Sequence, residues 1–383
     1  MRIVVNDIAA SKTGALSILK DFYNYIKRDE NRDIETESGL ERLEWVFLLS
    51  GPYIEERDNI RLITLPEVKG HRKRLDFELR YGGAYIMSLK PDVYFSVQNT
   101  LTRGVKCKSV VYVHQPLCFQ RVKNFSLFKA SEREYAVYQH IIGRLIYSAI
   151  KRADRTIVQT EWMRDEAIRR TKVSGEKVVK ITPDICIDPI PEVFSGEFSG
   201  KRFFYPSGNM LYKNHACLVR AVRLLLQQGI KDFEVILTLT EDELLRICPE
   251  AEGLIVESGS DFPGSRADTG IVCAGRLPRE EVLSYYRKGV LVFPSYIESF
   301  GYPPAEAKAV QGAILASDTP SSLEVLSGYD RAFYFDPFEP KELCELMKDS
   351  IEGRIFAEEG LSQDPGDRFE ESSWGKVLQV LAD

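Results

Sequence analysis

One stretch of the chain, residues 290–326, restricts the possible folds more than any other. It begins with a continuous apolar segment, Val290–Phe293, and a second apolar segment follows at Ala313–Ala316. Between them, Pro303 and Pro304 stand together, which predicts the start of a helix, because N–H groups in a first turn need no helical partner. Short apolar strands joined by a helix are typical of a parallel sheet that is covered on both faces.

Two glutamates lie on either side of the loop in this stretch. Glu298 follows the first strand, and Glu306 is expected in the first turn of the helix. The start of a helix offers unpaired N–H groups and a partial positive charge, which together bind phosphates. Carboxylates accept hydrogen bonds from sugar hydroxyls. The stretch therefore predicts a site for the phosphates and hydroxyls of a sugar nucleotide.

The alternation of strands and helices covers most of the chain and is interrupted once. Pro183–Arg202 contains three prolines and no apolar periodicity, which indicates a linker. A chain of 383 residues is also longer than one ordinary core. We therefore predict an α/β protein of two Rossmann-like domains, at residues 1–190 and 200–365, with parallel sheets facing across a cleft. A C-terminal helix within 366–383 is expected to pack back on the first domain through Trp374.

Composition argues against several classes of protein. No apolar run reaches the length of about 18 residues that a membrane-spanning helix needs. The amino-terminal segment reads as a strand rather than a signal peptide, so we expect a cytoplasmic protein with reduced thiols. The seven cysteines form no CxxC pair, and the four histidines lack metal-ligand spacing. The absence of a G-x-G-x-x-G motif after a strand disfavours a nicotinamide-dependent dehydrogenase. No metal, cofactor or nucleic acid is expected.

Charge is distributed unevenly along the chain. Residues 101–180 contain 17 lysines and arginines against 7 aspartates and glutamates, although the whole chain has a net charge of −6. Within this region, Gln120–Lys129 places cations beside aromatic residues. Lys69–Arg74, earlier in the first half of the chain, adds further positive charge. Such a pattern suits an anionic bilayer surface. An ordinary solvated basic surface, with some of the aromatics buried, is the alternative.

Three blocks of the second half resemble the retaining GT-B glycosyltransferases of family 4. They cover residues 203–222, 275–325 and 332–340, and the pattern FPSxxESFGxPPAEA around Glu298 and Glu306 is the most specific of them. In the first half, VYVHQP and TIVQTEWMRD are weaker matches. The resemblance implies a GT-B fold, with an acceptor-binding first domain and a nucleotide-sugar-binding second domain.

The resemblance also implies roles for residues of the second domain. Glu306 is expected to bind the ribose hydroxyls of the donor, and Glu298 to lie near the donor sugar without acting as a nucleophile. Lys213 is expected to neutralise the diphosphate of the leaving nucleotide. Backbone N–H groups would bind the phosphates or the sugar at Ser299, Phe300, Gly301 and Tyr302.

The sequence departs from the family pattern after the strand at 203–205. Many relatives have Gly-Arg there, whereas this chain has Gly208-Asn209, so Asn209 is expected to donate to the phosphate in place of the arginine. Arg276 is a further candidate nucleotide contact. In the first domain, the resemblance points to His114 against the donor sugar or acceptor, and to roles for Thr160 and Gly14 in the acceptor-side loops.

Taken together, these features predict a metal-independent, retaining hexosyltransferase. Its substrates would be a nucleotide-diphosphate sugar (GDP-mannose, a UDP-hexose and dTDP-rhamnose all remain open) and a glycan or polyprenyl-diphosphate-linked acceptor. The expected setting is the synthesis of a bacterial surface polysaccharide, such as capsule, O-antigen or exopolysaccharide, at the inner face of the cell membrane. A sugar-nucleotide epimerase of the same architecture and a non-catalytic binding protein are the alternatives.

Overall fold

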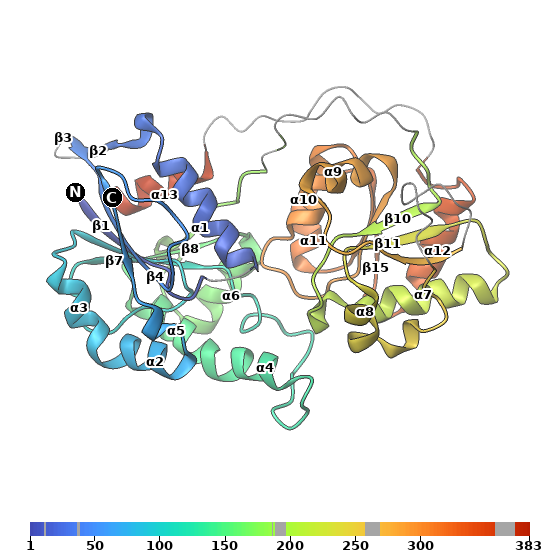
Figure 1. Cartoon of the computed structure of the whole chain (residues 1–383), viewed down its shortest axis with the longest axis horizontal. Helices are drawn as coiled ribbons and strands as arrows, with labels where there is room; N and C mark the ends of the chain where they lie inside the picture. Colours follow the sequence, from blue (N-terminus) through green and yellow to red (C-terminus); the bar gives the residue numbers. More distant parts are fainter. Residues whose placement is uncertain (11–12, 37–38, 186, 188–196, 257–268, 357–371) are drawn as a thin grey trace. The chain divides into compact units, whose positions relative to one another are not determined.

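The computed structural model describes the whole chain except residues 11–12, 37–38, 186, 188–196, 257–268 and 357–371 (Figure 1). The chain forms two compact units. Unit 1 contains Met1–Asp184 together with the C-terminal Phe369–Asp383, and unit 2 contains Ile185–Arg368. None of the described helices is both long and apolar enough to cross a bilayer.

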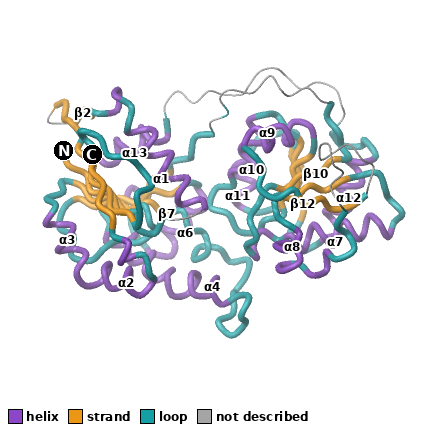
Figure 2. Tube along the Cα trace, in the orientation of Figure 1, coloured by secondary structure: helices purple, strands orange, loops and turns teal. Residues whose placement is uncertain are grey.

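Unit 1 is built on a seven-stranded sheet whose described pairings are all parallel, in the order β5-β4-β1-β6-β7-β8-β9. The central strands are buried almost from end to end, because helices cover both faces (Figure 2). A separate antiparallel hairpin is formed by β2 and β3. The strands are β1 (Arg2–Asn6), β2 (Asp33–Thr36), β3 (Gly39–Arg42), β4 (Glu44–Leu49), β5 (Ile60–Thr64), β6 (Val93–Ser96), β7 (Lys108–Val113), β8 (Arg155–Val158) and β9 (Val178–Lys180).

Successive residues of β1 point into two different cores. Ile3 and Val5 pack in one core with residues of α1 and α13, whereas Val4 packs in the other with residues of α3, α5 and α6. This is the two-residue period expected of a strand between two helical layers. The helices of unit 1 are α1 (Thr13–Ile26), α2 (His71–Asp76), α3 (Gly82–Ser88), α4 (Arg133–Ala136), α5 (Gly143–Arg152), α6 (Glu161–Thr171) and α13 (Ser373–Ala382), with π-helical segments at Phe77–Tyr81 and Val137–Ile142.

The C-terminal helix α13 completes the first core of unit 1. The Trp374 ring lies 4.8 Å from the ring of Phe22 between centroids. At the other end of the helix, the Lys108 ammonium donates to the carbonyls of Val380 at 3.0 Å and Leu381 at 2.8 Å. The last carbonyls of a helix have no partner within it, so this lysine supplies hydrogen bonds that the helix itself cannot.

Unit 2 repeats the architecture with a six-stranded parallel sheet in the order β12-β11-β10-β13-β14-β15. Its strands are β10 (Arg202–Tyr205), β11 (Glu234–Leu237), β12 (Gly270–Cys273), β13 (Val290–Phe293), β14 (Ala313–Ser317) and β15 (Ala332–Phe335). Its helices are α7 (His215–Gln227), α8 (Glu241–Ile247), α9 (Arg279–Lys288), α10 (Tyr302–Ala309), α11 (Pro320–Val325) and α12 (Pro340–Ile351).

Replacing Leu381 by alanine should destabilise unit 1, because the side chain is fully buried in the core beneath α13. Removing a buried leucine side chain costs about 2–5 kcal/mol of unfolding free energy. All three tryptophans, Trp45, Trp162 and Trp374, belong to unit 1, so tryptophan fluorescence in urea reports the unfolding of this unit. Lys376→Ala, on the exposed side of the same helix, is the matched control. Equal midpoints for Leu381→Ala and the control would contradict the packing of α13 on unit 1.

Candidate functional site

The carboxyl ends of β10 and β13 bring two charged side chains together in unit 2. The two strands are adjacent and parallel, so the loops that follow them leave the same edge of the sheet. Lys213 ends the short 3-10 turn after β10, and Glu298 lies in the loop after β13. Although 85 positions separate them in sequence, Lys213 Nζ lies 2.5 Å from Glu298 Oε1. The side chains are only 13% and 14% exposed, respectively.

The ion pair retains capacity to bind a ligand. The Ser295 hydroxyl also donates to Glu298 Oε1, at 2.6 Å. Among the described residues, both partners of Glu298 therefore act on one carboxylate oxygen, and Oε2 remains open to a hydroxyl donor. An ammonium group has three donors, of which Lys213 uses one on Glu298. The remaining donors suit the oxygens of an anion.

Asn214 ties the loops around this pair to one another. Its backbone is left-handed, with φ of 59°, and its side-chain amide donates to the carbonyls of Pro294 at 3.0 Å and Pro337 at 2.7 Å. One residue thus joins the exits of β10, β13 and β15. The Tyr205 hydroxyl donates to the carbonyl of Lys213 at 2.8 Å, and burial raises the pKa of Tyr205 well above its usual range, so it stays a donor.

The position of Glu306 corrects the sequence-based expectation. We expected it in the first turn of its helix, but α10 begins at Tyr302, and no acidic residue lies in the first turn. The helix starts earlier because Gly301 adopts φ of 95°, a conformation that only glycine reaches easily, and reverses the chain before the two prolines. Glu306 is therefore the fifth helical residue, where the charge of the helix start acts on it more weakly.

Two side chains from α9 hold Glu306. Arg279 Nη1 lies 2.7 Å from one carboxylate oxygen, and the Tyr286 hydroxyl donates to the other at 3.2 Å. Burial and the nearby Glu306 carboxylate raise the pKa of Tyr286 well above its usual range, so the tyrosine remains a donor. Glu306 is 8% exposed. Each of its oxygens can accept a further hydrogen bond, so the network orients the carboxylate without saturating it.

The other predicted donor-side residues occupy loops at the same edge of the unit 2 sheet. Phe300 is buried, and its carbonyl accepts a hydrogen bond from the Ser321 hydroxyl at 2.6 Å. Arg276 is exposed in the loop after β12, and it is Arg279, three residues later, that contacts Glu306. The remaining predicted residues lie in the loops after β10 and β13 or at the start of α10: Gly208, Asn209, Ser299, Gly301 and Tyr302.

A neutral histidine supports the loop after β10. His215 Nε2 lies 3.0 Å from the Ser207 hydroxyl, and the Ser207 N–H donates to the Thr238 hydroxyl at 3.0 Å. Burial, and secondarily the positive charge of Lys213, lowers the pKa of His215 to about 4. At neutral pH it is an uncharged hydrogen-bonding group, so it adds no charge to the edge that carries Lys213.

In unit 1, His114 directly follows β7 at the carboxyl edge of the sheet. Its backbone N–H donates to the Asn99 side chain at 2.7 Å, and its Nε2 lies 3.3 Å from the Asn99 amide nitrogen. Burial lowers the pKa of His114 to about 4, so the ring is neutral near pH 7. Its Nδ1 is buried and has no partner among the described residues. A ring nitrogen without a partner can bind a hydroxyl.

Asp7 lies at the same edge, after β1. It is 1% exposed, its Oδ2 has no hydrogen-bond partner in the described structure, and burial raises its pKa from 3.8 to about 8. The carboxyl group is therefore largely protonated at neutral pH. Thr160 is buried at the start of α6, after β8, and Gly14 is exposed in the first turn of α1. The structure thus gathers polar side chains from the exits of β1, β6, β7 and β8.

Several of these residues were missed from the sequence. Asn214 carried a signal, because asparagine directly before a helix is typical of a cap. Asp7 also carried one, since it is an acidic residue directly after an apolar strand. Ser295 lay within the recognised motif. Nothing in the spacing of Arg279 and Tyr286 indicated that α9 would direct both toward Glu306, because that depends on how α9 packs beside α10.

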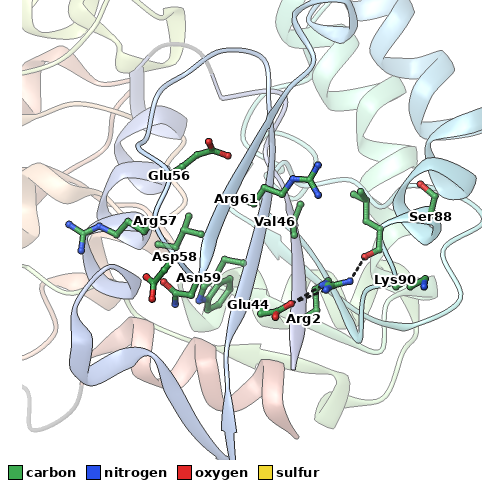
Figure 3. Close-up of a pocket in the computed structure, with 13 residues that line it drawn as sticks. Arg2, Glu44, Val46, Glu56, Arg57, Asp58, Asn59, Arg61, Ser88 and Lys90 are labelled. Carbon is green, nitrogen blue, oxygen red and sulfur yellow. Dashed lines mark hydrogen bonds and ion pairs between the residues drawn. The ribbon is translucent and has the colours of Figure 1, made fainter.

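A described hollow lies elsewhere in unit 1. It has a volume of about 720 Å³ and is lined by the amino ends of β1, β4 and β5 and by the end of α3 (Figure 3). Arg2, one of its cations, is already engaged by Glu44 at 3.0 Å and by the carbonyl of Leu89 at 3.1 Å. Because this hollow is at the amino edge of the unit 1 sheet, it is separate from the His114 edge. Among the described residues, no cluster of histidine, cysteine, aspartate or glutamate could hold a metal ion.

Comparison with known proteins gives a family match in the second half of the chain. Residues 193–360 match the family Glycosyl transferases group 1. The chain is 24% identical over 251 residues to a D-inositol 3-phosphate glycosyltransferase of Streptomyces avermitilis, covering 62% of this chain and 52% of the relative. It is also 24% identical over 220 residues to the serotype-specific mannosyltransferase WbdA of Escherichia coli, covering 55% of this chain and 26% of the relative. The matched region thus spans about half, or less, of these relatives.

Solved structures extend the likeness to both units. The sucrose-phosphate synthase of Thermosynechococcus elongatus has a TM-score of 0.61 and 14% identity, covering 100% of this chain and 95% of that chain. Anabaena HepE in complex with UDP-glucose has a TM-score of 0.58 and 14% identity, covering 92% and 90%. The chain has a GT-B fold, with two Rossmann-like parallel-sheet domains, and its second unit resembles a group 1 glycosyltransferase domain.

Asn214 variants should separate the backbone requirement at this position from the hydrogen-bond requirement. Asn214→Gly keeps the left-handed conformation easily but leaves two carbonyls without their donor, which costs about 1–3 kcal/mol. Asn214→Ala adds a steric cost of about 1–2 kcal/mol. We therefore expect unit 2 to unfold at a lower temperature in calorimetry for both variants, and more so for alanine. Asn209→Ala, in the exposed loop, is the control. Unchanged unit 2 transitions in both Asn214 variants would contradict the role assigned to this amide.

Asp7 should make the stability of unit 1 depend on pH. In the folded state Asp7 keeps a proton that it loses in the unfolded chain above about pH 4. Its contribution to the stability of unit 1 is therefore largest at low pH and is lost as pH rises toward 8. The slope approaches about 1.4 kcal/mol per pH unit and levels off above the folded pKa. Asp7→Asn should therefore gain stability over the wild type as pH rises from 5 to 8, measured by urea unfolding and tryptophan fluorescence. Parallel pH profiles for the two proteins would show that Asp7 is not held protonated.

Proposed function

We propose that this protein is a metal-independent, retaining glycosyltransferase that moves a hexose from a nucleotide-diphosphate sugar to a hydroxyl acceptor. The observation that carries the proposal is the Lys213–Glu298 pair, which is closed at 2.5 Å and stands at the exits of two adjacent parallel strands. The ligand-binding edge of a parallel α/β sheet lies at the carboxyl ends of its strands. The pair also lies inside the segment that matches group 1 glycosyltransferases.

Lys213 is proposed to bind the diphosphate of the donor. When the bond between the anomeric carbon and the diphosphate oxygen breaks, negative charge develops on the leaving group, and a fixed cation stabilises it. The backbone N–H groups at the start of α10 would share that charge. In the unliganded protein, Lys213 is neutralised by Glu298, so donor binding requires the lysine to exchange or share this partner.

Glu298 is then available to the sugar. Its Oε2 is open within the described structure, and a carboxylate there accepts hydroxyl hydrogen bonds and stabilises positive charge at the anomeric carbon. In the proposed front-face reaction, the acceptor oxygen bonds to the anomeric carbon on the side from which the nucleoside diphosphate departs. The acceptor proton passes to the departing diphosphate oxygen, so no enzyme nucleophile is required.

Glu306 is proposed to bind the ribose hydroxyls. Arg279 and Tyr286 hold its two oxygens, which fixes the carboxylate before the nucleotide arrives. A carboxylate that is already oriented loses less conformational freedom when it binds the ribose hydroxyls. Asn209 and Gly208 after β10 and Arg276 after β12 remain proposed nucleotide contacts, together with the backbone of Ser299–Tyr302.

Unit 1 is proposed to bind the acceptor. His114, neutral at pH 7, would form a hydrogen bond with a donor-sugar or acceptor hydroxyl. Gly14 and Thr160 would contribute from α1 and from the start of α6. The acceptor is proposed to be a glycan or a polyprenyl-diphosphate-linked sugar in bacterial surface-polysaccharide synthesis, at the cytoplasmic face of the membrane. The name of the serotype-specific mannosyltransferase relative supports that setting.

Donor binding tests the proposal directly. A ligand that binds only the folded state stabilises it by about 2.7 kcal/mol at one hundred times its Kd. We therefore expect the correct nucleotide sugar to raise the unfolding temperature of unit 2 in calorimetry. Losing a charge-assisted hydrogen bond costs about 1.5–3 kcal/mol, so Lys213→Ala and Glu306→Ala should each weaken donor binding by about 10-fold to 100-fold.

The matched controls for these variants are Lys231→Ala and Glu281→Gln, both at exposed positions of unit 2. Wild-type donor affinity in both site variants would defeat the assignment of the donor site. Turnover separates the alternatives: a transferase releases nucleoside diphosphate and forms an acceptor glycoside of retained configuration. An epimerase changes the sugar nucleotide without an acceptor, and a binding protein gives no product.

A further inference from the structure

A loop in unit 1 displays large apolar side chains to solvent. Phe128 is 95% exposed, and Val122 and Leu127 are 46% and 41% exposed. Ile141, on the π-helical segment that follows the loop, is 54% exposed. These four residues are called the apolar tip below. Within the described chain, no other large hydrophobic side chain is as exposed as Phe128.

The base of this loop is fastened by reciprocal hydrogen bonds. The Gln120 side chain donates to the carbonyl of Lys123 at 2.6 Å and accepts from the Lys123 N–H at 2.9 Å. The Gln139 side chain donates to the same carbonyl at 2.8 Å and accepts from the Phe125 N–H at 2.9 Å. His140 Nε2 lies 3.2 Å from the Phe125 carbonyl. Two consecutive residues of the π-helical segment therefore hold the loop.

The part of the loop that carries the apolar tip is fastened as well. Phe125 is buried, with its ring 5.3 Å from that of Tyr135, so one aromatic residue anchors the loop inside the protein. The Ser126 N–H donates to Glu132 at 2.9 Å, and Arg133 Nε donates to the carbonyl of Leu127 at 3.2 Å. A loop held by this many contacts presents Phe128 at little further cost in conformational entropy.

The chemistry around the apolar tip is cationic. Arg121, Lys129, Arg133 and Arg144 are all exposed within the same loop and helix. Arg121 and Lys129 are paired with Glu166 and Glu132, but the surrounding region, residues 101–180, retains a large excess of positive charge. Apolar side chains among lysines and arginines are the composition that binds anionic bilayer surfaces.

A second basic segment covers the same face of the unit 1 sheet. Phe77, at the end of α2, and Ile146, in α5, contribute to one core, so these helices lie in one layer. α2 and α4 both follow the lower side of unit 1 in Figure 1. Arg72, Lys73 and Leu75 of α2 are exposed. Positive charge therefore extends beyond the loop on this layer.

We propose that residues 120–133 dock unit 1 on an anionic lipid bilayer, with Leu127 and Phe128 entering the boundary between headgroups and acyl chains while the neighbouring cations contact lipid phosphates. The observations that carry this proposal are independent of the transferase chemistry. Docking would also hold the acceptor-binding unit at the surface where lipid-linked sugars reside. This consequence rests on the proposed function.

Vesicle co-sedimentation of the full chain tests the docking surface. We expect binding to vesicles of phosphatidylglycerol and phosphatidylcholine, weaker binding to phosphatidylcholine alone, and a loss in high salt, because surface charge is screened. Phe128→Ser should lower the partition constant about tenfold or more, since burying a phenylalanine contributes about 1.5–3 kcal/mol. The matched control is Leu40→Ser, another highly exposed apolar residue of unit 1, on β3 outside the apolar tip.

Two further measurements keep the result interpretable. If the apolar tip enters the bilayer, brominated lipids should quench the tryptophan fluorescence of Phe128→Trp more than that of the wild type, which contains only the three native tryptophans. Nucleotide-sugar binding by unit 2 should be unchanged in Phe128→Ser, so failure of docking and failure of the proposed function are distinguished. Wild-type vesicle binding by Phe128→Ser would overturn the proposal. Concentration-dependent self-association without lipid, abolished by the same substitution, would overturn it in favour of a second copy of the chain.

Discussion

The contact between Lys213 and Glu298 depends on the pairing of β10 with β13, and much of the rest of unit 2 serves to hold it. A largely buried ion pair adds little to stability, because the loss of hydration offsets most of the attraction. Its value lies in placing both charges at a sheet edge before a ligand arrives. The Asn214 amide fixes the backbone on either side, and the Ser295 hydroxyl fixes the carboxylate. In the proposed reaction, a diphosphate would compete with Glu298 for Lys213, and the released carboxylate would become available to the sugar.

The sequence predicted the alternating strands and helices, the fold class and the two charged residues of this pair, because all of these follow from local patterns and a specific motif. It placed Glu306 in the first turn of the helix, because the proline pair was taken as the helix start, whereas Gly301 turns the chain before Tyr302 and Glu306 is the fifth helical residue. It could not predict the amide of Asn214 reaching Pro337, since that contact joins positions 123 residues apart through tertiary structure.

The protonation states of Asp7 and His114, at the carboxyl edge of the unit 1 sheet, could not be predicted from the sequence either. Asp7 and His114 have ordinary pKa values in an unfolded chain, and burial shifts them in opposite senses, toward the neutral form of each. The result is an edge with uncharged polar groups, one able to donate a proton in a hydrogen bond and the other able to accept one. Such groups suit the hydroxyls of a sugar, which carry no charge themselves.

This neutrality bears on the basic charge of the first half of the chain. If the excess of lysine and arginine served the reacting groups directly, cations would be expected at the carboxyl edge of the unit 1 sheet. Most of the cations in residues 101–180 instead occupy the loop at 120–133 and the helices α4, α5 and α6, and Lys180, which ends β9 at the carboxyl edge, is paired with Glu161. In unit 2 the reverse holds, because a net acidic half carries a largely buried cation, Lys213, where an anion is proposed to bind. The regional excess of positive charge therefore fits the proposed association with a surface, whereas the charge at the strand exits fits the proposed chemistry.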